Sequence, residues 1–233
     1  MASESDTREL TGRQLRAAET RRRMMKSASS VFSAQGYAKS TMDAIAADAG
    51  VAVQTLYFTF GTKAELLQAA YDFAVLGPDS VPPHLTEWWR AAEAEPDLHK
   101  AVQIIVAGTL DVFARAAPLV WAVHSDPDAQ PAYRINEDLR ASGYLTLIEL
   151  LAKKAPLRPP LDVLHARDIL LALLSPATYI MLTAEAGWSA VEYADWVGAA
   201  IARELFSEGI AAVARSDRGG GAVVAVGGVG LST

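Results

Sequence analysis

The chain contains no cysteine, and its four histidines are scattered along the sequence. The lack of cysteine excludes thiolate catalysis, cysteine-bound zinc, iron–sulfur clusters and disulfide bonds. The histidines show no HExxH spacing, and neither a GxSxG nor a GxxxxGK[ST] pattern occurs. We therefore expect a protein that is not an enzyme and that uses neither a metal ion nor a cofactor.

Long apolar runs and targeting signals are also missing. The longest uncharged helical run, residues 169–184, has 16 residues, fewer than the roughly 18 to 20 that span a bilayer. Residues 1–12 form a polar arm without the basic start and apolar stretch of a secretory signal. The glycine-rich residues 215–233 lack the flanking strand and helix of a dinucleotide site, so they are interpreted as a flexible tail. A cytoplasmic protein without membrane contact is expected.

Strand-like alternation is scarce, and apolar residues recur at helical spacing, which predicts an all-α fold. Glycine and proline residues around position 80 separate an N-terminal domain, residues 13–76, from a helical bundle, residues 77–214. Thr41 and Thr62 are candidate N-caps, and Gly36 and Gly50 are candidate helix ends. Helices are expected at about 14–35, 41–50, 53–58, 62–76, 86–94, 97–115, 118–125, 130–154, 162–185 and 189–213.

The net charge of −6 is unevenly distributed along the chain. Residues 13–63 carry eight basic and three acidic side chains, whereas residues 64–233 carry twelve basic and twenty-one acidic ones. The acidic total is therefore an average over two segments of opposite sign. The positive segment is compatible with binding to nucleic acid.

Residues 41–60 show the pattern of a helix-turn-helix, with two short helices joined by a tight turn at Gly50. Small and apolar residues fill the crossing between the helices: Ile45, Ala46, Ala49, Val51 and Leu56. The side chains left to point outward from the second helix are Val53, Gln54, Thr55, Tyr57, Phe58 and Thr59. This mixture is typical of a helix that reads base edges in the major groove.

Individual contacts to DNA can be assigned by chemistry. Gln54 has the amide that pairs with adenine, and Val53 can pack on a thymine methyl group. Thr41 and Lys63 begin helices, where a phosphate is bound favourably. Two readings of the basic first helix remain open, because Arg21 and Arg22 could contact the DNA backbone or simply form a solvated face.

The N-terminal segment resembles the DNA-binding domain of the tetracycline-repressor (TetR) family of transcriptional regulators. The matching positions are Arg22, Met24, Met25, Ala28, Phe32, Gly36, Tyr37, Thr41, Ile45, Ala46, Ala49, Gly50, Val51, Thr55, Leu56, Tyr57, Phe60, Lys63, Leu66 and Leu67. The resemblance implies phosphate contacts from Thr41, Thr55, Tyr57 and Lys63, and base contacts near Val53 and Gln54. The chain departs from the family pattern at Ala52 and Gln54, so no relative's operator sequence can be transferred to it.

The resemblance further implies that the second domain is a helical bundle that binds a small molecule and forms a homodimer. A lipophilic or aromatic effector is expected among the large side chains of the middle helices: Trp88, Trp89, Phe113, Trp121, His124, Tyr133, Tyr144 and Tyr179. Residues 169–206 are expected to form the dimer interface through an apolar stripe. The expected interface residues are Leu173, Ala177, Ala194, Val197, Ile201 and Leu205. The alternative is that these residues form the core of their own chain.

The sequence thus predicts a DNA-binding transcriptional regulator, a repressor that leaves a palindromic double-stranded operator when it binds its effector. A dimer suits such an operator, because each recognition helix reads one half-site. The alternative is an adaptor that has kept the fold and no longer binds DNA.

Overall fold

A computed structural model describes residues 12–77 and 79–207 of the chain. Helices dominate the described residues, and an isolated β-bridge joins Leu157 to Phe206. This confirms the all-α prediction. The N-terminal arm up to residue 11, the glycine-rich tail and the predicted end of the last helix after residue 207 lie outside the described residues.

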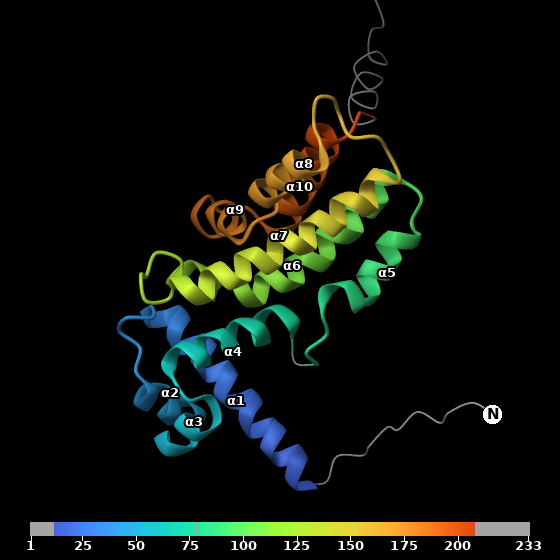
Figure 1. The fold of residues 1–233 in the computed structure, drawn as a ribbon. Helices are drawn as coiled ribbons and strands as arrows, with labels where there is room; N and C mark the ends of the chain where they lie inside the picture. Colours follow the sequence, from blue (N-terminus) through green and yellow to red (C-terminus); the bar gives the residue numbers. More distant parts are fainter. Residues whose placement is uncertain (1–11, 78, 208–233) are drawn as a thin grey trace, which may run out of the picture.

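The first four helices form the lower part of the molecule in Figure 1. They are α1 (Gly12–Gln35), α2 (Met42–Ala49), α3 (Val53–Phe60) and α4 (Lys63–Leu76). The predicted caps are confirmed, since the Thr41 hydroxyl accepts from the Ala44 amide at 3.1 Å and Thr62 forms a capping box with Glu65. Gly50 ends α2 at φ 63°, a conformation that glycine adopts without strain.

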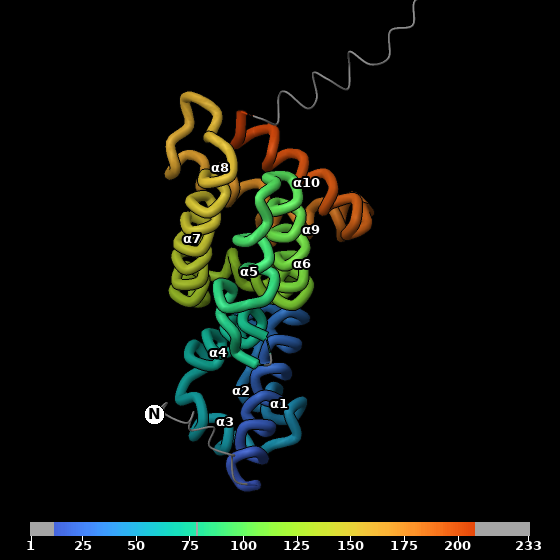
Figure 2. The backbone as a smooth tube through the Cα atoms, turned by 90° about the vertical axis from the view of Figure 1, so that its right-hand side faces the viewer, coloured from blue at the N-terminus to red at the C-terminus, as the bar shows by residue number. Residues whose placement is uncertain are grey.

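The remaining helices form the upper part of the molecule (Figure 1). They are the short turn η1 (Pro83–Leu85), α5 (Glu87–Ala94), α6 (Leu98–Val123), α7 (Gln130–Ala152), α8 (Val163–Leu173), α9 (Pro176–Ile180), the π-helical turn η2 (Met181–Glu185) and α10 (Ala190–Leu205). Helix α6 is central, because it packs against α1, α4, α5, α7, α9 and α10. Figure 2 shows α6 beside α7, with α5 next to them and α8 to α10 at the far end from α3.

The two predicted domains share one core at their junction. Leu119 and Val123, at the end of α6, are fully buried in the same apolar cluster as Phe32 and Ile45 from the N-terminal helices. Helix α4 also packs against both α6 and α7. A displacement of α6 or α7 would therefore change the packing of the N-terminal helices.

Two predicted helix boundaries were wrong. The predicted helices 97–115 and 118–125 are one helix, α6, which continues through Pro118. An internal proline removes one hydrogen bond and costs roughly 3 kcal/mol, but the Pro118 ring is exposed and its neighbours Ala117 and Leu119 are buried, so packing holds the helix together. The predicted helix 162–185 is broken at Leu174 and Ser175, because Pro176 disfavours helical geometry in the residue before it.

Two of the described helical stretches, Leu98–Val123 and Val163–Glu185, are long and apolar enough to cross a membrane by length and composition. The first is α6, whose apolar side chains face the six helices packed around it. The second includes the break at Ser175. Burial in the bundle accounts in part for the composition of the first stretch, of which 44% is buried, whereas 22% of the second stretch is buried.

Candidate nucleic-acid interface and ligand cavity

Helix α3 presents most of its predicted reading residues to solvent. Gln54 and Thr55 are exposed, Tyr57 is 50% exposed and Phe58 is 93% exposed. Leu56, with no exposed surface, anchors the opposite face of the helix in the core. The helix therefore carries a protruding polar and aromatic face on a fixed base.

The other two predicted reading residues, Val53 and Thr59, are half-buried on α3. The Thr59 hydroxyl donates to the Thr55 carbonyl at 2.7 Å, so it is already used within the helix. At the start of α3, Ala52 offers no side-chain cap to the first backbone amides. Uncapped amides at a helix N-terminus suit a phosphate oxygen.

Basic side chains of α1 and α4 secure the helix-turn-helix. Arg23 donates from Nε to the Ala49 carbonyl at 2.8 Å, which joins α1 to the end of α2. Lys63 donates from Nζ to the carbonyls of Tyr37 and Ser40 at 2.9 and 3.2 Å. Because Ser40 precedes Thr41, the structure brings the two predicted phosphate-binding residues Thr41 and Lys63 together.

Arg21 and Arg22 occupy different surroundings on α1. The guanidinium carbon of Arg21 lies 4.4 Å from the centre of the Phe60 ring at the end of α3. Arg22 forms an exposed ion pair with Glu19 at 3.3 Å. Arg21 therefore lies beside the predicted reading helix. Contact of Arg21 and Arg22 with the DNA backbone stays a prediction.

A cavity of about 730 Å³ lies between α4, α5, α6 and α7. Its walls are mainly apolar and aromatic, as in sites for small organic molecules. Five of the eight predicted effector residues line it: Trp88, Trp89, Phe113, Tyr133 and Tyr144. The structure thus collects in one place residues that are up to 56 positions apart in the sequence.

The other three predicted effector residues do not line this cavity. Trp121 and His124, near the end of α6, stack on each other with ring centres 5.1 Å apart, and Trp121 is 42% exposed. Tyr179 lies against Phe113 and Tyr193, with ring centres 5.8 and 5.3 Å away. These side chains therefore fill or cover the bundle beside the cavity.

Sequence reasoning missed two important cavity residues, Tyr71 on α4 and Arg140 on α7. Tyr71 lies in a helix that was assigned wholly to the DNA-binding domain. Arg140 lies in a charged segment of the sequence, which is typical of a solvent-exposed helix face. Arg140 donates from Nε and Nη2 to the Glu137 carboxylate at 3.2 and 2.5 Å. Burial lowers the pKa of Arg140, but the hydrogen bonds and charge interactions with Glu137 and Tyr144 together outweigh it, and the pKa lies above its ordinary value.

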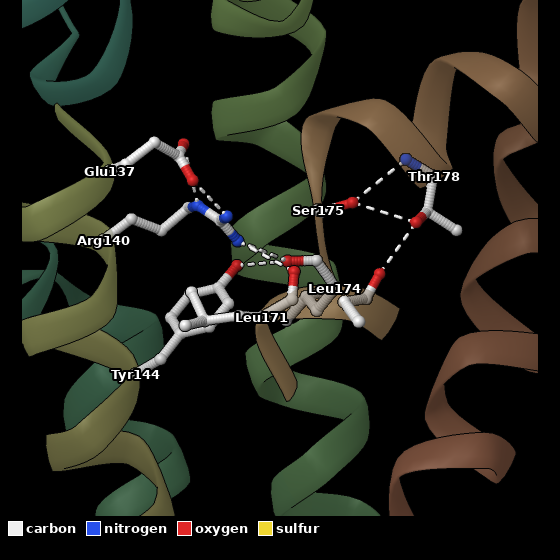
Figure 3. A network of polar contacts seen from close by, with 8 residues as sticks. Glu137, Arg140, Tyr144, Leu171, Leu174, Ser175 and Thr178 are labelled. Carbon is white, nitrogen blue, oxygen red and sulfur yellow. Dashed lines mark hydrogen bonds and ion pairs between the residues drawn. The ribbon is translucent and has the colours of Figure 1, made fainter. Parts of the chain in front are cut away.

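The cavity wall is joined to the break between α8 and α9 (Figure 3). A helix end leaves its last carbonyls without helical partners, and here side chains from three other helices donate to four of them. The pairs are Arg140 with Leu171, Thr178 with Ala172, Tyr193 with Leu173, and Tyr144 with Leu174, at 2.7–3.2 Å. Burial raises the pKa of Tyr144 to about 12, so its hydroxyl remains a donor.

The predicted dimer residues fall into two groups. Val197, Ile201 and Leu205 are at most 1% exposed and pack in the core of their own chain, so they are unavailable to a second copy. Their stripe on α10 faces α6, which leaves no solvent-facing surface there. The remaining three are accessible, since Ala177 is exposed and Leu173 and Ala194 are half-buried.

Comparisons with known proteins match the region that contains the helix-turn-helix. Residues 25–70 match the family model of bacterial regulatory proteins, tetR family. No curated protein matches the chain.

Three solved structures illustrate the likeness of the fold. NalD from Pseudomonas aeruginosa, the secondary repressor of a multidrug efflux pump, is 18% identical with a TM-score of 0.62, over 82% of this chain and 99% of that one. A regulator FadR from Bacillus subtilis, solved with stearoyl-CoA, is 17% identical with a TM-score of 0.61, over 78% and 97%. A TetR-like transcriptional regulator from a Rhodococcus species is 19% identical with a TM-score of 0.56, over 80% and 95%.

The match covers α2, α3 and their capping residues, and the fold likeness extends over the helical bundle. Residues 25–70 are therefore similar to the tetR family of bacterial regulatory proteins, and the chain has a fold like that of a TetR-like transcriptional regulator.

Proposed function

We propose that the chain is a sequence-specific, DNA-binding transcriptional regulator, a repressor that a small molecule releases from its operator. The observation that carries the proposal is the face of α3, where Gln54, Tyr57 and Phe58 project while Leu56 is buried. A helix held in this way can enter the major groove with a defined orientation. Its relatives by fold are regulators and not enzymes, which supports a regulatory role for this chain.

The DNA partner is a palindromic duplex bound by a homodimer. One reading helix covers only a few base pairs, and two half-sites on one face of DNA lie about 34 Å apart. The end of the bundle formed by α8 to α10 supports the dimer, because apolar side chains lie exposed there. They include Met181 at 49%, Val191 at 69% and Trp196 at 37% exposure. A second copy of the chain would cover this apolar surface.

The effector site is the cavity between α4, α5, α6 and α7. Helix α4 supports this assignment, because its first residue, Lys63, holds the turn before α2, and a later residue, Tyr71, lines the cavity. A ligand that favours one position of α4 therefore favours one position of α3 in each subunit. Release of DNA follows as a population shift between two spacings of the reading helices.

The descriptions of two structural relatives also support the proposed repression and its control by a ligand. One was solved with stearoyl-CoA, and another is described as a repressor of an efflux pump. These descriptions support ligand-controlled repression and a cytoplasmic location, where DNA and small metabolites are both accessible.

The test is selection of binding sites from a random DNA pool, followed by binding measurements at two salt concentrations. A palindrome with half-sites about one helical turn apart is expected, and binding should weaken as salt rises. If the chain selects no sequence at modest salt, the regulator proposal fails and the adaptor reading replaces it. Gln103→Ala, an exposed change on the bundle, is the control that should leave DNA binding unchanged.

A further inference from the structure

Tyr71 carries a buried hydroxyl group that has no partner. Its side chain has no exposed surface, and its Oη is the one buried side-chain nitrogen or oxygen without a hydrogen bond among residues 12–77 and 79–207. A buried polar group left unpaired costs about 1–3 kcal/mol. Tyr71 lines the cavity, so a ligand there can supply the missing partner.

The hydroxyl of Tyr71 acts as a donor. Burial raises its pKa above the ordinary value, and the nearby Tyr133 and Glu137 raise it further. Both neighbours line the same cavity. The proton therefore stays on the oxygen at neutral pH, so the hydroxyl can donate a hydrogen bond.

Three other polar side chains around the cavity already donate to backbone carbonyls of their own helices or of a neighbouring one. The Tyr144 hydroxyl donates to the Leu174 carbonyl at 2.7 Å, and the Thr109 hydroxyl donates to the Ile105 carbonyl at 2.8 Å. The Asn136 amide donates to the Ala132 carbonyl at 2.8 Å. Tyr71 is left with the one fully buried hydroxyl at the cavity, among the described residues, that has no partner.

The cavity offers no free cation to a negatively charged ligand. Among the described residues, Arg140 is its one arginine and no lysine lines it. The Arg140 guanidinium is occupied by Glu137 and by the carbonyls of Leu171 and Leu174. Asp72, at the same wall, adds a negative charge. A carboxylate or phosphate on the ligand would therefore be desolvated without a partner.

The shape and lining of the cavity favour a flat ligand. Trp88 and Trp89 form one wall, with ring centres 5.7 Å apart, and Phe113, Tyr133 and Tyr144 lie around the remaining space. Aromatic side chains recognise planar rings by stacking and edge contacts. A volume of about 730 Å³ admits a molecule of several fused rings.

We propose that this cavity binds an uncharged, planar aromatic molecule through one carbonyl oxygen that accepts a hydrogen bond from the Tyr71 hydroxyl. The proposal rests on the proposed function only in treating this cavity as the effector site. The chemical class of the ligand follows from the cavity itself and can be tested without DNA.

Three pyrene derivatives of nearly equal size separate the features of the proposed ligand. 1-Acetylpyrene is neutral and has a carbonyl acceptor, 1-ethylpyrene is neutral without an acceptor, and 1-pyrenecarboxylate is an anion. Their affinities for the full chain are measured by quenching of tryptophan fluorescence at about pH 8, above the ordinary pKa of histidine. The ketone is expected to bind about tenfold more tightly than either of the others.

The variant Tyr71→Phe should remove the advantage of the ketone over the ethyl compound. Its thermal unfolding should match or exceed that of the parent, because the change deletes an unpaired hydroxyl. Tyr57→Phe, at an exposed tyrosine of α3 that does not line the cavity, is the matched control and should keep the preference for the ketone. Equal or tighter binding of the carboxylate, an unchanged preference in Tyr71→Phe, or no binding of the ketone would each overturn the proposal.

Release of DNA is measured separately on a selected operator. If 1-acetylpyrene binds through Tyr71 and the protein stays on its operator, the ligand class stands and effector-controlled repression fails. If the chain binds a selected operator and the ketone does not bind the chain, the ligand class fails and the DNA-binding function stands.

Discussion

The Lys63 ammonium group donates to the Tyr37 carbonyl at 2.9 Å and lies 4.1 Å from the centre of the Tyr37 ring. A second hydrogen bond, to the Ser40 carbonyl at 3.2 Å, places the first residue of α4 against the turn between α1 and α2. Lys63 therefore fixes the base of the helix-turn-helix in the free chain, in addition to its predicted contact with a phosphate.

Lys63→Ala should lower both stability and DNA affinity. Loss of two charge-assisted hydrogen bonds and a cation–π contact should lower the free energy of unfolding by about 2 kcal/mol. DNA binding should weaken evenly across sequences, because a phosphate contact carries no base information. Chemical unfolding and fluorescence anisotropy measure the two effects. Lys39→Ala, at an exposed lysine of the same turn, should not alter stability; a matching loss there would contradict the specific role of Lys63.

Gly108→Ala should disturb the wall of the cavity. A Cβ atom at Gly108 on α6 would lie 2.3 Å from the Trp88 ring, so Trp88 must move. We expect the free energy of unfolding to fall by about 1–3 kcal/mol, with altered binding of aromatic ligands. Gly143→Ala on α7 is the control, because nothing lies within 4 Å of its Cβ position, and it should stabilise the helix by about 0.5–1 kcal/mol. Equal effects of the two changes in thermal unfolding would refute the steric argument.

Stability should fall above pH 10 because of three buried tyrosines. Burial raises the pKa of Tyr71, Tyr144 and Tyr193 in the folded chain. In the unfolded chain a tyrosine loses its proton near pH 10, so alkaline pH favours unfolding and the stabilisation is complete only below that pH. The free energy of unfolding, measured with denaturant from pH 8 to 12, should decline in this range. Tyr71→Phe should show a shallower decline, and identical slopes would disprove the contribution of Tyr71.

Trp196→Glu should convert the proposed homodimer into monomers. Trp196 on α10 is 37% exposed and lies 5.9 Å from Trp188 between ring centres. A carboxylate at a covered apolar surface would be buried without a partner. Light scattering coupled to size-exclusion chromatography gives the mass of each species, and operator affinity should fall with dissociation. Trp196→Phe should remain dimeric, whereas a dimeric Trp196→Glu would place the interface elsewhere.

The N-terminal domain could be predicted from sequence, because the residues that begin and end its helices act locally. Thr41, Gly50 and Thr62 mark helix ends by their own backbone chemistry, and the buried Leu56 follows from the spacing of apolar residues. Exposure of the reading face of α3 followed from the same spacing. What these side chains contact on DNA stays a prediction.

The bundle was less predictable, because its outcomes depend on packing between distant segments. The apolar stripe of α10 was predicted to be a dimer surface, with core as the alternative, and contact with α6 shows that Val197 and Ile201 are core. Tyr71 could not be recognised as a cavity residue, since its helix carries the capping signals of the DNA-binding domain. Only the approach of α7 to α4 brings Tyr133 near it.

In the proposed regulator, α3 reads DNA sequence through Gln54. The most direct test of this role compares the dissociation constants of the parent chain and Gln54→Ala on a selected palindrome and on its single-base variants, by fluorescence anisotropy at fixed salt. The parent should discriminate at a particular base pair of each half-site, and Gln54→Ala should lose about 1–3 kcal/mol of that discrimination, with other positions unchanged. Equal affinity of the two proteins for the selected and altered sites would contradict this role.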